Sequence, residues 1–253
     1  MNGAAGTRNH GDTIAILPLG AHEYHGPHLP LDTDTLIAEG IAARLQSALP
    51  ADLDVVFLDA DLIGYSIEHT DREGTRSIAW NEAVEGWLDL AENLASTGIR
   101  KLILLNAHGG NSPLLTVVAT EARVRFNMLC VATSWTRFGV PDGVITPEDK
   151  AIDIHGGAIE TSVMLALHPE MVDMSAARNF TSRQSDFIAD FKHLRAYGPH
   201  AFGWKMRDLN DNGAAGDATA ATAEKGELLI AHSVRGLVEL VADVADFDAG
   251  ILV

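Results

Sequence analysis

The apolar positions of this chain form short runs that alternate with helical patterns. Four runs predict buried strands, at residues 14–17, 55–58, 102–105 and 128–135. Helical patterns follow from about residue 33 through Leu45, and at about 80–96, 112–125, 160–168 and 222–247. A run as short as 14–17 does not by itself exclude a buried helical segment. The alternation of strands and helices is typical of an α/β domain.

Cap signals and spacing refine the helices. Thr33 or Asp34 is a plausible N-cap for the first helix, which carries apolar side chains at Leu36, Ile37, Ile41 and Leu45. Trp80 and Trp87 are seven residues apart on the second helix and share one face. We therefore expect both tryptophans to lie in the core.

Three stretches between the predicted elements are irregular. Residues 58–77 mix glycine with charged side chains and predict a loop. Residues 136–150 are rich in glycine and proline and predict a loop that could act as a mobile flap. Residues 175–216 place Phe202, Trp204 and Met206 beside glycines. Aromatic side chains in such a segment mark a lid, a subunit contact or a buried loop anchor, and the sequence leaves these three open.

Acidic and imidazole side chains gather where the predicted strands end. Glu23, His25 and Asp34 follow the first strand, His108 follows the strand 102–105, and His155 and Glu160 precede a helix. In open α/β sheets, ligands bind beyond the carboxyl ends of the strands. Neighbouring polar residues are candidates for supporting these groups, namely His22, His28, Asp32, Asn106 and Asn111.

The residue types in these clusters suit a divalent metal ion. Carboxylate oxygens and neutral imidazole nitrogens bind Zn and Mn, and one carboxylate can bridge two ions. Glu23 and His25 are two residues apart, so an extended chain points both the same way. Any one of these residues could instead belong to a solvated polar loop, and a lone His108 could bind a backbone carbonyl. The recurrence of the pattern at three places favours a metal site.

Composition and charge restrict the other classes of function. The chain has 253 residues and 47% hydrophobic content, enough for one large α/β domain over residues 1–253. Its formal net charge of -17 disfavours nucleic acid and anionic membranes as partners. The first dozen residues lack the apolar stretch of a signal peptide, and no apolar run is long enough to span a bilayer. The single cysteine, Cys130, lies in an apolar run and predicts a buried, inert thiol. We expect a cytoplasmic protein.

Four segments resemble the motifs of the creatininase (creatinine amidohydrolase) family. They read GAHEYHGPHLPLDTD from Gly20, NAHGGN from Asn106, HGGAIETSVMLAL from His155 and GAAGDATAATAEKG from Gly213. The segments occur in the family's order, and the first is long enough that chance agreement is very improbable. The resemblance implies a three-layer α/β/α sandwich with a mostly parallel sheet and a homo-oligomer, commonly a hexamer.

The resemblance also implies roles for individual residues. Two divalent ions, Zn and/or Mn, would be held by Glu23, His25, Asp34, His108 and Glu160, with Asp34 as the bridging group. His155 matches the family's catalytic histidine. Creatininase itself is similar but has an acidic residue where this chain has Gly110, and a tryptophan and an acidic residue where it has Ala151 and Ile152. These departures point to a substrate other than creatinine.

The sequence therefore predicts a metal-dependent amidohydrolase of a small-molecule substrate. A metal-bound hydroxide would attack the carbon of a non-peptide amide, formamide or cyclic amide, and His155 would protonate the departing nitrogen. Ser66, Glu68, His69, Gly109 and Gly110 are candidate substrate contacts, with loop stabilisation as the alternative. Other possibilities are a peptidase of peptide-cofactor maturation, of the mycofactocin type, a two-metal phosphoesterase and a metal-binding protein without catalysis.

Overall fold

The computed structural model describes residues 12–248 and residue 251. The expectation that the first dozen residues lack a signal peptide falls, apart from Asp12, on residues outside this range. Over the described residues, no helix has both the length and the apolar character needed to cross a membrane.

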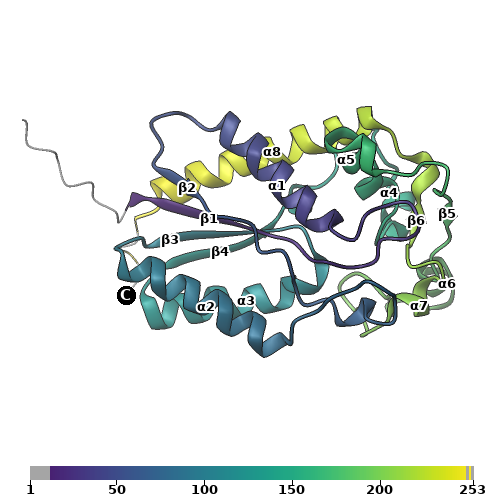
Figure 1. Cartoon of the computed structure of the whole chain (residues 1–253), viewed down its shortest axis with the longest axis horizontal. Helices are drawn as coiled ribbons and strands as arrows, with labels where there is room; N and C mark the ends of the chain where they lie inside the picture. The colour runs from purple at the N-terminus through teal and green to yellow at the C-terminus, as the bar shows by residue number, and fades with distance from the viewer. Residues whose placement is uncertain (1–11, 249–250, 252–253) are drawn as a thin grey trace, which may run out of the picture.

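A four-stranded parallel sheet forms the centre of the molecule (Figure 1). Its strands are β1 (Ile14–Leu19), β2 (Val55–Phe57), β3 (Lys101–Asn106) and β4 (Leu129–Ser134), in the order β2-β1-β3-β4. The two inner strands, β1 and β3, are buried at every position. Leu19 pairs with Asn106, so β1 and β3 end side by side, and the segments that follow them leave the sheet at the same edge.

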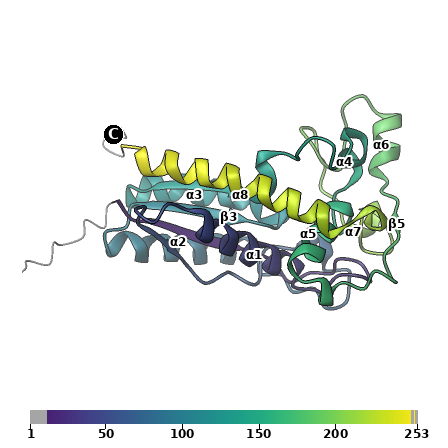
Figure 2. The ribbon, with the colours of Figure 1, turned by 90° about the horizontal axis from the view of Figure 1, so that it is seen from above.

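Helices cover both faces of the sheet (Figures 1 and 2). One layer holds α1 (Thr33–Ala48), α5 (Ala158–Leu167) and α8 (Ala223–Asp246), and the other holds α2 (Trp80–Ser96) and α3 (Ser112–Phe126). Successive strand residues point to opposite faces. Ile14 and Ile16 accordingly pack in the core with α1, α5 and α8, whereas Ala15 and Leu17 pack in the core with α2 and α3. The predicted three-layer α/β/α sandwich is confirmed.

The shorter elements gather at the end of the molecule where the central strands finish (Figure 1). They are the helices α4 (Pro147–Ile152), α6 (Gln184–Asp190) and α7 (Met206–Leu209), and the antiparallel pair β5 (Asn179–Phe180) and β6 (Gly216–Asp217). Single 3-10 turns lie at Ile67–His69, Gly109–Asn111, Trp135–Phe138, Pro169–Met171 and Ala218–Ala220. Residues 175–216 are therefore mostly irregular, as the sequence predicts.

The prediction for the two tryptophans is half wrong. Trp87 is 3% exposed and donates its Nε1–H to Asp61 over 2.7 Å, but Trp80 is 60% exposed. Trp80 is the first residue of α2, and the buried residues of this helix begin only at Ala83. Periodicity alone does not reveal how far along a helix its packed face begins.

Two element boundaries also differ from expectation. The N-cap of α1 is Asp32, so Thr33 and Asp34 already lie in the first helical turn. The stretch 136–150 is not wholly irregular, because α4 begins at Pro147. Thr146 caps that helix by accepting a hydrogen bond from the Asp149 backbone N–H over 3.1 Å.

Candidate metal centre

The predicted site residues come from four separate segments that meet beyond the carboxyl ends of β1 and β3. Glu23 and His25 lie in the loop after β1, and a backbone hydrogen bond from Glu23 N to Leu31 O closes that loop over 2.9 Å. Asp34 lies in the first turn of α1, His108 follows β3, and Glu160 lies in the first turn of α5. The parallel sheet thus brings together residues that are far apart in sequence.

Asp34 lies between two groups of possible metal ligands. One group is Glu23, Asp34 and His108, and the other is His25, Asp34 and Glu160, with the ligand atoms of each group within 4.8 Å of one another. A third group of the same kind, Glu23, His25 and His155, does not contain Asp34. Asp34 Oδ2 lies 3.2 Å from His108 Nδ1, and Asp34 Oδ1 lies 3.2 Å from His25 Nε2. Each oxygen of this carboxylate therefore faces a different group.

Three carboxylate oxygens of the first group make no hydrogen bond with the described residues, and two of them, Glu23 Oε1 and Asp34 Oδ2, face imidazole nitrogens. Glu23 is 1% exposed, and neither of its oxygens has a hydrogen-bond partner among the described residues; the same holds for Asp34 Oδ2. An ionised carboxylate buried without a partner is strongly unfavourable unless it is paired or coordinates a metal. The unpaired oxygens face imidazole nitrogens at about the spacing that ligands of one ion adopt. These residues fit a divalent cation.

Charge coupling within the cluster shifts the pKa values of the histidines that face carboxylates. Burial opposes protonation of His25, but the charge of Asp34 and a hydrogen bond to it raise the pKa of His25 to about 10. Burial likewise opposes protonation of His108, whereas Glu23 and Asp34 hold its pKa well above the usual range. Burial, followed by the charge of Asp34, raises the pKa of Glu160 to about 7, with His25 opposing.

Backbone carbonyls and asparagines fix the orientation of the imidazoles. His108 donates Nε2–H to Tyr65 O over 2.9 Å, which leaves Nδ1 toward Glu23 and Asp34. Asn106 accepts a hydrogen bond from His108 N and donates to His108 O, and Asn111 donates to Asn106. The prediction that Asn106 and Asn111 brace the His108 loop is confirmed. Such outer contacts set ligand orientation and tautomer.

The other supporting residues lie around the cluster rather than in it. His22 and Asp32 contact each other, Nδ1 to Oδ1, at 2.5 Å on a partly exposed surface. His28 Nε2 bonds Thr161 Oγ1 over 2.9 Å. Cys130 is mostly buried, and burial raises the pKa of its thiol to about 12, as expected for an inert side chain.

His155 lies against the cluster from the loop before α5. Its Nε2 donates to Tyr24 O over 2.8 Å, and its Nδ1 lies 3.6 Å from Glu23 Oε1. The ring stacks on that of His25 with centroids 4.1 Å apart. Burial, together with the charges of His25 and His69, holds the pKa of His155 well below its usual range. At neutral pH, His155 is therefore uncharged, and its Nδ1 carries a lone pair.

Four of the five candidate substrate contacts lie at or near the cluster, and the fifth, Gly109, faces open space. Ser66, His69 and Gly110 lie at the cluster: Ser66 Oγ is 3.3 Å from His108 Nε2, and His69 Nε2 is 3.4 Å from Glu23 Oε1. Glu68 lies near Gly110, because a Cβ added to Gly110 would be 2.7 Å from Glu68 Oε1. A Cβ added to Gly109, in contrast, would meet nothing within 4 Å.

Sequence reasoning missed the carbonyls of Tyr24 and Tyr65 and the position of Trp204. The Trp204 ring meets the ring of His69 edge-on, with centroids 6.1 Å apart. Carbonyl contacts carry no residue-type signal, so nothing in the sequence could have marked the two tyrosines. The aromatic cluster around Trp204 marked its segment but not the histidine that it contacts.

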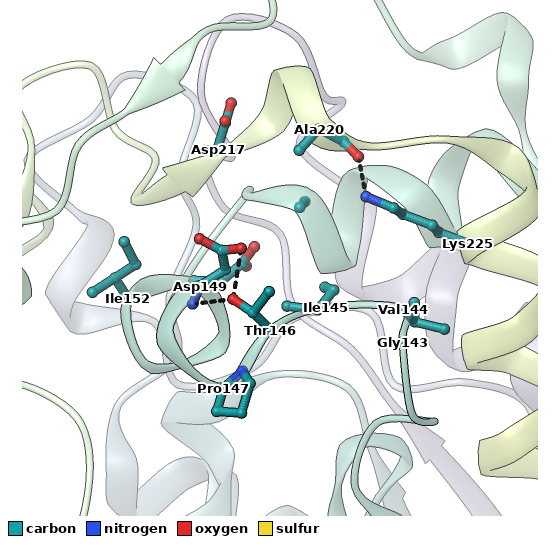
Figure 3. Close-up of a pocket in the computed structure, with 12 residues that line it drawn as sticks. Gly143, Val144, Ile145, Thr146, Pro147, Asp149, Ile152, Asp217, Ala220 and Lys225 are labelled. Carbon is teal, nitrogen blue, oxygen red and sulfur yellow. Dashed lines mark hydrogen bonds between the residues drawn. The ribbon is translucent and has the colours of Figure 1, made fainter.

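A cavity of about 400 Å³ lies beside α4 (Figure 3). Thr146, Asp149, Asp217 and Lys225 line it together with apolar side chains, and Lys225 donates to Ala220 O over 2.7 Å. None of the five candidate metal ligands lines this cavity. It is therefore separate from the metal centre.

Comparison with known proteins places these features in one class, that of α/β/α hydrolases with a cluster of acidic and histidine side chains at the sheet edge. Residues 4–241 match the family model described as Creatininase: Creatinine amidohydrolase. A mycofactocin precursor peptide peptidase of Mycolicibacterium smegmatis is 33% identical over 225 residues, which cover 88% of this chain and 82% of that protein.

Two further similarities agree. The creatinine amidohydrolase of Pseudomonas putida is 26% identical over 249 residues, covering 92% of this chain and 90% of that protein. A solved structure named "Creatininase Mn" superposes with a TM-score of 0.77 at 25% identity, covering 94% of this chain and 93% of that one. The chain belongs to the creatininase family and is a hydrolase that acts on carbon–nitrogen bonds.

Proposed function

We propose that this chain is a metal-dependent amidohydrolase that holds two divalent ions, Zn and/or Mn, and cleaves a non-peptide amide, formamide or cyclic amide. The observation that carries this proposal is the position of Asp34, whose two oxygens face two separate groups of ligand atoms. A carboxylate with that arrangement is suited to bridging two ions.

Five residues would hold the ions. Glu23 and His108 belong to the first site, His25 and Glu160 to the second, and Asp34 to both. Two bound ions would lower the pKa of water to near neutrality and polarise the amide carbonyl. Glu23, His25, Asp34 and His108 are buried, and the low local dielectric strengthens the electrostatic interactions among them.

His155 moves the proton in this proposal. Its Nε2–H is held by Tyr24 O, so Nδ1 is the nitrogen available for chemistry. Nδ1 would accept a proton from the attacking water and give it to the amide nitrogen as the carbon–nitrogen bond breaks. An amine is a poor leaving group unless it is protonated, so this transfer is needed for turnover.

A panel of substrates tests the proposal. Protein loaded with Mn or Zn would be assayed for product release from creatinine, formamides, small N-acyl amines, short peptides and p-nitrophenyl phosphate. We expect metal-dependent turnover of one amide class, lost on treatment with EDTA and reduced at least about 100-fold in His155→Ala. His155→Ala should keep its metal ions, because the two ligand groups that share Asp34 do not include His155; loss of an ion would instead make His155 a ligand through the third group, Glu23, His25 and His155. Faster hydrolysis of the phosphate ester than of any amide would contradict the proposal.

A peptide substrate is the second candidate. The relative at 33% identity is named as a peptidase of the mycofactocin precursor peptide, and its similarity covers most of both chains. The same panel separates the candidates: release of an amino acid or peptide from short peptides, with no turnover of formamides or N-acyl amines, would assign the peptidase activity.

A further inference from the structure

Four imidazole nitrogens converge on one oxygen of the cluster. Glu23 Oε1 lies 3.3 Å from His108 Nδ1, 3.4 Å from His69 Nε2, 3.6 Å from His155 Nδ1 and 4.0 Å from His25 Nε2. The proposed function gives specific roles to His25, His108 and His155. It leaves His69 as a general substrate contact without a chemical task.

A packing role does not account for His69. The residue is 2% exposed, and its Nδ1 has no hydrogen-bond partner within the described part of the chain. Burying a polar atom without a partner costs free energy that an apolar side chain of similar size would avoid. The other nitrogen, Nε2, faces Glu23 Oε1 at 3.4 Å without forming a hydrogen bond with the described residues, so its N–H points into the cluster and stays available to a substrate.

A role as a metal ligand does not fit either. Atoms that share one ion at about 2.0–2.2 Å lie at most about 4.4 Å from one another. None of the groups of three ligand atoms found within 4.8 Å among residues 12–248 and 251 includes His69. His69 therefore approaches Glu23 but does not lie in position to share an ion with two of the ligands.

The surroundings of His69 hold its ring beside that of His155. The two rings are tilted against each other, with centroids 4.2 Å apart and an angle of 37° between their planes. The preceding backbone is anchored at two points, because Asn111 accepts from Tyr65 N over 3.0 Å and Ser77 accepts from Ser66 N over 2.9 Å. Trp204 covers the ring edge-on. His69 is thus fixed in place before any substrate binds, which is what an electrostatic catalytic group requires.

We propose that His69 is a second catalytic imidazole, which donates its Nε2–H to the carbonyl oxygen of the substrate amide. The inference rests on the proposed function. When water adds to the amide carbon, the C=O electron pair moves onto the oxygen, and the His69 N–H stabilises that charge without being transferred. As the C–N bond breaks, His155 supplies the proton to the nitrogen and the pair returns to form the carboxylic acid. The two neighbouring imidazoles would thus act on one amide group, His69 on its oxygen and His155 on its nitrogen.

Two substitutions separate the nitrogen of His69 from its packing. His69→Phe keeps a ring of similar size against His155 and Trp204 but has no N–H. His69→Ala removes the ring as well. We expect His69→Phe to lower kcat by about 10²–10³, the usual cost of one oxyanion donor, with KM changed much less. Its metal content should equal that of the wild type. His168→Phe, at the exposed end of α5, is the control for a histidine outside the site.

Phenylphosphonate binding gives a readout that needs no identified substrate. Its tetrahedral, negatively charged oxygens resemble the adduct that His69 would stabilise, so it should bind the metal-loaded wild type more tightly than His69→Phe by about tenfold or more. Equal phosphonate affinity in the two proteins, or loss of a metal ion from His69→Phe, would overturn the inference. If no amide in the panel is hydrolysed, the proposed function fails, whereas the phosphonate measurement still decides the role of His69.

Discussion

The carboxylate of Asp34 is the residue on which both proposed ion sites depend. Asp34→Asn keeps the shape of the side chain but removes its charge, so it should weaken both ligand groups at once. We expect the metal content after dialysis to fall from about two ions per chain to below about one. Atomic emission spectroscopy measures this directly. Asp32→Asn is the matched control, because Asp32 contacts His22 and not the cluster. Full metal content in Asp34→Asn would rule out a bridging role.

Gly109 and Gly110 test how closely the backbone packs against His108. A methyl group at Gly110 would lie 2.4 Å from Tyr65 O and 2.5 Å from His108 Nε2, whereas one at Gly109 would meet nothing within 4 Å. Gly110→Ala should therefore displace the carbonyl that orients His108, weaken metal binding about tenfold or more, and destabilise the fold by about 1–3 kcal/mol. Gly109→Ala should change little. Metal titration and thermal unfolding of the pair would show the difference, and equal behaviour would contradict it.

The sequence could reveal the residues whose side chains are able to bind a metal ion. Glu23, His25 and Asp34 stood out because strand 14–17 ends just before them, and the structure brings them together with His108 and Glu160. Their roles as ligands stay predictions until metal binding is measured. The convergence of His69 and His155 on one oxygen depends on how two loops fold over the sheet edge, and no local pattern encodes that.

The strands and helices were predictable where their burial in the core produces a clear pattern of apolar residues. β1 and β3 lie at the centre of the sheet and read as apolar runs, but the sequence ended the first run before Pro18, which lies inside β1. Proline is tolerated there because β2 ends at Phe57, so no strand residue beyond it needs the missing N–H, and Pro18 O still accepts from Asp61 N over 3.0 Å. The sequence does not predict the short helix α4, because Pro147 lies in a stretch rich in glycine and proline, which is typical of a loop, although proline is also common in the first turn of a helix.

Packing between α5 and α8 should tolerate no added volume. A Cβ at Gly226 of α8 would lie 2.0 Å from Ser162 O of α5, whereas one at Gly86 on the exposed face of α2 would meet nothing within 4 Å. Gly226→Ala should lower the free energy of unfolding by about 1–3 kcal/mol, and Gly86→Ala should raise it by about 0.5–1 kcal/mol through helix propensity. Urea unfolding of both variants checks the opposite signs. A stable Gly226→Ala would show that the two helices can separate without cost.

At the scale of the whole molecule, several expectations stay predictions. The single domain over 1–253, the homo-oligomer, the exclusion of nucleic acid and membranes as partners and the cytoplasmic location are not tested by the fold. Analytical ultracentrifugation of the metal-loaded chain would measure the assembly. The assembly also bears on residues 175–216, which the sequence left as a lid, a subunit contact or a buried anchor. Trp204 already contacts His69 within one chain. This part of the segment therefore lies against the candidate site in any oligomeric state.

Metal binding should release protons and should stabilise the folded chain. In the metal-free chain the pKa of His25 is about 10 and that of His108 is well above its usual range. Both side chains are therefore positively charged imidazolium groups at neutral pH. A ligand nitrogen must lose its proton to bind an ion, so metal binding should release protons. The apparent metal affinity should therefore rise with pH through the range 6–10 and fall as the solution is acidified. Glu160, whose pKa is about 7, adds to the release only below that pH.

Calorimetric titration with Mn in buffers of different ionisation enthalpy measures this release. We expect at least about one proton per chain at pH 7, and a melting temperature that rises with metal concentration because the ions bind only the folded site. Asp34→Asn provides the control: without that carboxylate the charge that raises the pKa of His25 is reduced, so fewer protons should be released per ion bound. Binding with no dependence on buffer would mean that the two histidines are neutral in the metal-free chain, and that the charge coupling within the cluster is weaker than its geometry indicates.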